Sequence, residues 1–147
     1  MAENRADIEK AGCNACGNRG SIPGERVPIA RVREKLDILE AAGDEKGAVR
    51  LLDYWLTEAR SIGDETGEIL VENEFVGLYR KAGLGEAALA HGTQALDLLR
   101  AGGLEGTVTA GTTRINLATA CIAFGQPDRA RILFEDARRI YESRLDP

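Results

Sequence analysis

Hydrophobic residues recur at helical spacing from residue 28 onward. In the first such stretch the apolar positions fall at i, i+3, i+7 and i+10, and they are Ile29, Val32, Leu36 and Leu39. This period places apolar side chains on one face of a helix, and no window alternates for long enough to predict a strand. Similar stripes predict six helices, at residues 28–42, 45–62, 66–82, 86–100, 105–124 and 127–144.

Glycine follows most of the predicted helices, and aspartate precedes two of them. Asp44 and Asp64 stand where a carboxylate accepts hydrogen bonds from the free N–H groups of a first helical turn. Glycine readily adopts the left-handed conformation that ends many helices, so these glycines predict turns. They recur about every twenty residues, at Gly43, Gly63, Gly83, Gly102, Gly103 and Gly125.

The first 27 residues lack this order. A short helix is predicted at residues 3–11, and residues 12–24 then contain four glycines and one proline. That composition is typical of a loop or a partly disordered arm. We therefore expect an irregular N-terminal arm at residues 1–27 and one helical domain at residues 28–147.

A longer period runs through the helical part. Gly43, Gly83 and Gly125 are separated by 40 and 42 residues, which predicts a helical repeat. Small residues at set distances from these glycines let the second helix of a pair approach the first. Five residues after each glycine stand Ala48, Ala88 and Ala130, and twelve residues after each stand Trp55, Ala95 and Ala137.

The pattern resembles the tetratricopeptide repeat over about residues 29–142. The first unit departs from it at Trp55, where a small residue is usual, and this leaves the angle and register of its helix pair open. The matching positions are Leu39, Gly43 and Ala48 in the first unit, Tyr79, Gly83, Ala88 and Ala95 in the second, and Leu117, Ala118, Cys121, Gly125, Ala130, Phe134 and Ala137 in the third.

This resemblance implies an all-α fold, a right-handed superhelical array of antiparallel helix pairs. The three units span about residues 29–64, 65–103 and 105–144. The commonest repeat of the family has about 34 residues. The longer period of this chain implies longer helices, similar to the kinesin-light-chain type of repeat.

The resemblance also implies a concave groove, lined by the first helix of each pair, that binds a peptide or helix of another protein. Asn73 is the sharpest candidate, because an asparagine side chain can donate to and accept from a peptide backbone. The alternative is a solvated polar residue. No clamp for a C-terminal carboxylate is expected, since the position after the small helix residue holds no asparagine in any unit. The candidates are Arg33, Asp37 and Glu40, then Asn73, Gly77, Arg80 and Lys81, and then Ile115, Thr119 and Ile122.

Charge and composition exclude some classes of protein. The chain carries 24 acidic and 19 basic residues, a net charge of -5, which argues against a nucleic-acid-binding protein. No apolar run approaches the roughly 18 residues of a membrane span, and the first ten residues lack the apolar core of a secretory signal. We therefore expect a cytoplasmic protein that binds neither nucleic acid nor membrane.

Candidate chemistry is sparse. Cys13 and Cys16 have the spacing of half a zinc site, but the remaining ligands available are His91 and Cys121, which lie on predicted helices. The alternative is an arm with two exposed thiols. No nucleophile–base pair, phosphate-binding loop or cofactor motif is present in the sequence. We expect no metal, no cofactor and no enzymatic activity.

Self-association, or a scaffold role, is the alternative function. The last predicted helix carries Ile132 and Leu145 outside its main apolar stripe, and no capping helix follows it. Arrays of repeats need polar ends to remain soluble. We therefore expect the C-terminal edge to be covered in a homodimer, or else to continue into a longer array.

Overall fold

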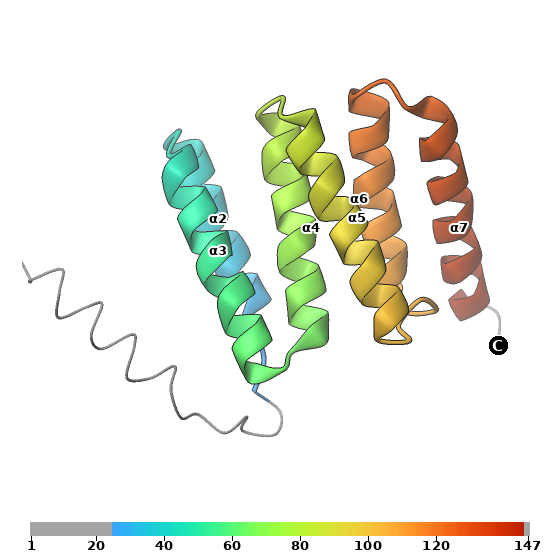
Figure 1. The fold of residues 1–147 in the computed structure, drawn as a ribbon, viewed down its shortest axis with the longest axis horizontal. Helices are drawn as coiled ribbons and strands as arrows, with labels where there is room; N and C mark the ends of the chain where they lie inside the picture. The colour runs from blue at the N-terminus through green and yellow to red at the C-terminus, as the bar shows by residue number, and fades with distance from the viewer. Residues whose placement is uncertain (1–24, 146–147) are drawn as a thin grey trace, which may run out of the picture.

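The computed structural model describes residues 25–145, and these residues form helices joined by short turns (Figure 1). The predicted helix bounds are confirmed to within one residue, except at the start of the fifth. That helix begins at Val108, because Thr107 accepts a hydrogen bond from the N–H of Ala110 and so caps the first turn. The helices are α2 (Ile29–Ala41), α3 (Glu45–Ile62), α4 (Glu65–Lys81), α5 (Gly85–Ala101), α6 (Val108–Ala123) and α7 (Pro127–Leu145).

Residues 1–24 and 146–147 lie outside the described residues. The short helix expected at residues 3–11 and the pair Cys13 and Cys16 fall in this part of the chain. The boundary between an arm at residues 1–27 and a helical domain at residues 28–147 therefore stays a prediction.

The helices form two layers. In Figure 1 they stand side by side in chain order. Helix α4 contacts both α2 and α6, and these three helices make an inner layer. Helices α3 and α5 each pack between two helices of that layer, while α7 packs against α6. Between residues 25 and 145 the fold is thus all-helical, a solenoid of antiparallel pairs, as predicted. The right-handed sense of its superhelix stays a prediction.

The buried core depends on small residues where the helices of a pair approach each other. Ala48, Ala88 and Ala130 are at most 1% exposed, which confirms their predicted packing role. Larger side chains fill the space between successive pairs. Leu52 of α3 and Phe75 of α4, for example, belong to one buried cluster. Each pair is therefore held both by its own contact and by the next pair.

The turns end the helices by one repeated geometry. The glycines after α2, α3, α4, α5 and α6 have φ between 66° and 76°, the left-handed region that glycine adopts without strain. The N–H of the following residue then donates to a carbonyl in the last helical turn, as from Asp44 to Leu39 at 2.9 Å and from Gln126 to Cys121 at 2.7 Å. This is the Schellman motif, and it confirms the turns predicted from glycine.

The first pair is packed less closely than the other two. Trp55 of α3 occupies the place that Ala95 and Ala137 hold in the later pairs, where those alanines are 0% and 2% exposed. An indole on this face keeps α3 from approaching α2 as closely as α5 approaches α4. The sequence left the packing of the first pair open because of Trp55. In the structure, the two helices of this pair are more widely separated.

Asp64 secures the start of the described chain. Its carboxylate accepts from the N–H of Gly67 at 3.0 Å, which caps α4, and from the N–H of Val27 at 2.8 Å. The side chain is buried and also lies 3.7 Å from the guanidinium of Arg26. Asp44 caps α3 in the same way, through the N–H of Gly47 at 2.9 Å, but it is exposed.

Replacing Asp64 tests whether this bond anchors the segment before α2. Asp64→Ala leaves the buried N–H of Val27 unpaired as well as removing a cap, so we expect the free energy of unfolding to fall by about 2–3 kcal/mol. Asp44→Ala is the matched control and removes a cap alone, at about 1 kcal/mol. Urea denaturation followed by circular dichroism measures both. Equal losses in the two variants contradict the anchoring role.

Candidate functional site

One stripe of α4 remains uncovered by other helices. Residues around it, such as Val71, Glu72 and Phe75, are buried against neighbouring helices. The accessible residues of this stripe follow at intervals of four, three and four, which is the spacing of a single helix face. They are Leu70, Glu74, Gly77 and Lys81.

The repeat period carries this stripe onto both neighbouring inner helices. Residues 40 before and 42 after Gly77 are Asp37 of α2 and Thr119 of α6. Asp37 is exposed and Thr119 is partly exposed. We call the exposed stripes of α2, α4 and α6 the inner face. It is the surface on which the groove predicted from the sequence would lie.

Ion pairs tie α2 to α4 along the inner face. Arg33 donates to Glu74 at 2.6 Å, and Lys81 lies 3.3 Å from Glu40. Both pairs therefore involve residues that the sequence offered as ligand contacts. Asp37 and the half-buried Arg80 have no ion-pair partner among residues 25–145. These two side chains keep opposite charges available on the inner face.

Gly77 leaves a notch in the inner face. A Cβ added there meets no atom within 4 Å, so the packing of α4 does not require glycine at this position. Gly92 of α5 differs, because a Cβ there lies 2.5 Å from Cδ1 of Leu117 on α6. Glycine at position 92 lets two helices approach, whereas glycine at position 77 exposes the backbone of α4.

Substitution of each glycine by alanine distinguishes these two roles. Gly77→Ala removes the entropic cost of a glycine within a helix, so we expect the protein to be more stable by about 0.5–1 kcal/mol. Gly92→Ala forces Leu117 to move, and we expect a loss of about 1–3 kcal/mol. Thermal unfolding of both variants measures the difference. A destabilised Gly77→Ala variant contradicts the open notch.

Asn73 lies inside the fold and not on the inner face. It is 4% exposed, and its Nδ2 donates to Oγ1 of Thr113 on α6 at 3.0 Å. This differs from the expectation that Asn73 clamps a peptide backbone, because its position on α4 faces the next inner helix. Its Oδ1 is also buried and has no partner among the described residues.

Two predicted residues of α6 point toward the end of the array. Ile122 lines a pocket of about 400 Å³ together with Pro127 and Phe134 of α7. Ile115 follows Asn73 by 42 residues, so it occupies the side of α6 that corresponds to the covered side of α4. Both isoleucines are exposed, at 57% and 36%. We call the surface around Ile122 and Phe134 the C-terminal edge.

The structure thus brings part of the predicted set together. Sequence reasoning missed Leu70 and Glu74, although both were accessible to it, since they precede Gly77 by seven and three residues on one helix face. The predicted residues that lie on the inner face, or at its rim in the case of Arg80, are Arg33, Asp37, Glu40, Gly77, Arg80, Lys81 and Thr119.

The contacts of His91 serve to pack helices together. Its Nδ1 lies 2.5 Å from Oε2 of Glu72, and its ring stacks on Phe75 at 4.3 Å and on Tyr79 at 5.4 Å between ring centroids. The Glu72 carboxylate is 1% exposed and lies 3.8 Å from Arg60 of α3. These contacts join α3, α4 and α5, so His91 packs in the fold without a nucleophile beside it.

The third cysteine is buried as well. Cys121 is 0% exposed, and desolvation by burial raises the pKa of its thiol, against a smaller opposite effect of Arg129. Across residues 25–145 no three His, Cys, Asp or Glu side chains gather in a way that suits a metal ion. None of the helices described here has the length and apolar character of a membrane span.

Comparison with known proteins identifies a family. A family model described as "Tetratricopeptide repeat" matches residues 67–143, which run from α4 to α7. No curated protein and no solved structure matches the chain. The likeness to the kinesin-light-chain type of repeat stays a prediction. The first helix pair falls outside the matched residues.

Proposed function

Because the chain belongs to the tetratricopeptide repeat family, whose repeats are generally protein-interaction modules, we propose that its inner face binds a peptide or helix of a partner protein. The proposed contacts are Arg33, Asp37, Gly77, Arg80 and Thr119, joined by Leu70 and Glu74. No catalytic role is part of this proposal.

The open notch at Gly77 is the observation that carries the proposal. Glycine within a helix costs stability and is commonly retained where another backbone must approach closely. The fold does not use this glycine, since a Cβ there contacts nothing. A ligand that lies from α2 to α6 passes between Asp37 and Thr119, and so crosses the notch. Its backbone then approaches α4 at Gly77.

Charge and apolar surface near the notch support the same function. Asp37 and Arg80 have no ion-pair partners within the described residues, so neither is neutralised before a ligand arrives. Leu70, two helical turns before Gly77, offers a partly exposed apolar side chain. This combination suits a peptide that carries both charges and at least one apolar residue.

The test uses a peptide selected on the intact chain. A phage-displayed random peptide library supplies the ligand, and isothermal titration measures its affinity for variants. Gly77→Gln fills the notch, and we expect binding to weaken at least about tenfold, as for loss of a contact worth roughly 1.4 kcal/mol. Ala90→Gln adds the same side chain to an exposed position of the outer helix α5 and leaves binding unchanged. Equal affinities of the two variants refute inner-face binding.

Self-association is a second candidate function, and it rests on the C-terminal edge. Ile122 and Phe134 line its pocket and are 57% and 37% exposed, and Ile132, which lies outside this lining, is 57% exposed. Apolar residues gathered around a pocket of about 400 Å³ are typical of an interaction surface. We propose that two copies bury this edge against each other as a homodimer.

Light scattering at increasing protein concentration tests the homodimer. We expect a dimer for the natural chain and a monomer for Phe134→Glu, because a carboxylate at a buried interface is strongly unfavourable. Ile38→Glu alters an exposed apolar residue of α2 at 69% exposure and serves as the control that keeps the dimer. A natural chain that remains monomeric at millimolar concentration rules the dimer out.

A further inference from the structure

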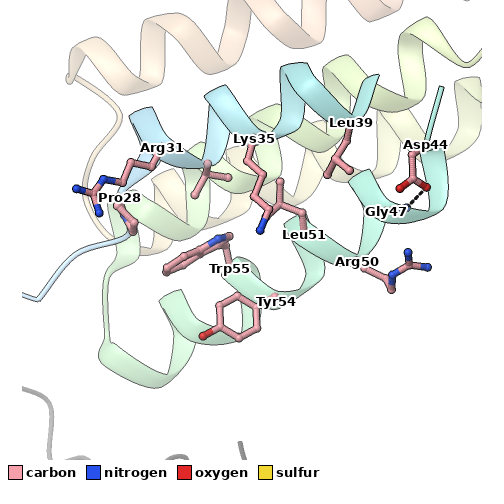
Figure 2. A pocket seen from close by; sticks show the side chains of 11 residues that line it. Pro28, Arg31, Lys35, Leu39, Asp44, Gly47, Arg50, Leu51, Tyr54 and Trp55 are labelled. Carbon is pink, nitrogen blue, oxygen red and sulfur yellow. Dashed lines mark hydrogen bonds between the residues drawn. The ribbon is translucent and has the colours of Figure 1, made fainter. Parts of the chain in front are cut away.

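A second surface lies at the opposite end of the array, between α2 and α3. Figure 2 shows an open pocket there, with a volume of about 580 Å³. Its apolar lining includes Leu39 of α2 and Leu51, Tyr54 and Trp55 of α3. Trp55 holds these helices apart, so the same residue opens the pocket and forms part of its wall.

Comparison with the second repeat unit indicates which structural element could pack on this surface. Arg31 and Lys35 precede Val71 and Phe75 by 40 residues each. In the second unit, Val71 and Phe75 are buried in a cluster with residues of the first pair, at 0% and 1% exposure. On α4, this side packs against the preceding helix pair. Arg31 and Lys35 therefore lie on the side of α2 against which a preceding helix pair would pack.

Cations replace apolar residues on this side of the first unit. Arg31, Lys35 and Arg50 line the pocket, are exposed and have no ion-pair partner anywhere in residues 25–145. In Figure 2, Arg31 and Arg50 lie at opposite ends of the pocket with Lys35 between them. The carboxylate of Asp44, also in the lining, is already used to cap α3. With three cations and one carboxylate in its lining, the pocket carries a net positive charge.

Aromatic side chains give the same pocket an apolar floor. Tyr54 and Trp55 form an edge-to-face pair, with ring centroids 5.1 Å apart and an interplanar angle of 87°. Tyr54 is 58% exposed. Exposed aromatic rings beside unpaired cations favour a ligand with both apolar side chains and carboxylates.

We propose that this pocket docks an acidic amphipathic helix of a partner protein. Its apolar face packs on Leu39, Leu51 and Trp55, in the manner of a preceding helix in the array. Its carboxylates pair with Arg31, Lys35 and Arg50. This surface is distinct from the inner face, and its occupant is bound by a different set of side chains.

Other occupants match the charge of the pocket less well. Residues 1–24 of the chain itself carry three acids (Glu3, Asp7, Glu9) and three bases (Arg5, Lys10, Arg19), so they bring no net negative charge. The C-terminal edge of a second copy presents Arg131, Glu135 and Arg138 in its pocket, and Arg138 already pairs with Glu142, so this edge offers the cations fewer free carboxylates than an acidic helix does. A nucleic acid would gain little from Leu39 and Leu51, and the net charge of -5 opposes it.

Trp55 makes the proposal directly measurable, because it is the sole tryptophan of the chain. The probe is a synthetic helical peptide of about 16 residues, with leucines at positions i, i+3, i+4 and i+7 and glutamates beside them. A matched peptide carries lysine in place of each glutamate. We expect a saturable change in Trp55 fluorescence with the acidic peptide, weakened by salt, and none with the basic one.

Variants locate the binding. Arg31→Gln and Lys35→Gln each weaken the acidic peptide about three- to tenfold, whereas Arg80→Gln, at the rim of the inner face, leaves its affinity unchanged. Circular dichroism verifies that each variant is folded. If Arg80→Gln weakens binding of the acidic peptide and Arg31→Gln does not, the peptide binds the inner face. This result overturns the proposal for the pocket and leaves the proposed function of the inner face standing.

Four further outcomes also overturn it. Equal response to the acidic and basic peptides, or no response to the acidic peptide at about 1 mM, removes the charge argument. A change in Trp55 emission of the peptide-free full chain on Glu3→Lys or Asp7→Lys assigns the pocket to the N-terminal residues. Displacement of the peptide by a single-stranded oligonucleotide assigns it to nucleic acid.

Discussion

Burial of α4 on nearly every side is the constraint on which the rest of the structure depends. This helix packs against α2, α3, α5 and α6, so most of its residues are chosen for packing. Even its polar residues serve this purpose. Glu72 enters the core with His91 as a hydrogen-bonding partner, and Asn73 bonds to Thr113. Gly77 is an exception, because no neighbouring helix covers it. Packing therefore does not explain this glycine, and it supports the proposal that a ligand binds there.

Local signals in the sequence were enough to predict most of the fold. They were not enough to predict which neighbouring helix a given side chain faces. Helix stripes, turn glycines and capping aspartates act over a few residues, and the structure confirms them. Asn73 was misplaced because its environment is set by Thr113, forty residues away. Ile122 was assigned to the groove because the family pattern gives a residue's position along its helix. Whether a neighbouring helix covers that side depends on which pairs exist, and this is a property of the whole array.

The departures of the first unit from the repeat form a consistent set. Lys35 stands where the later units have Phe75 and Leu117, and Trp55 stands where they have Ala95 and Ala137. Taken singly, each looks like a weakened copy of the pattern, and the family match begins only at residue 67. Taken together, they convert a surface for packing another repeat into a charged and aromatic pocket. This is the surface at which we propose that an acidic helix docks.

The wide separation of α2 and α3 has a consequence for the cooperativity of unfolding. In a linear array, stability is approximately a sum of terms for each unit and each contact between neighbours. Helix α2 has the least extensive contacts with its neighbours, so its opening requires the least free energy and its amide protons exchange sooner than those of α4. A ligand held by both α2 and α3 stabilises only the closed form of this pair. Binding in the pocket and the opening of α2 are then coupled, so a higher ligand concentration keeps a larger fraction of the molecules with α2 in place.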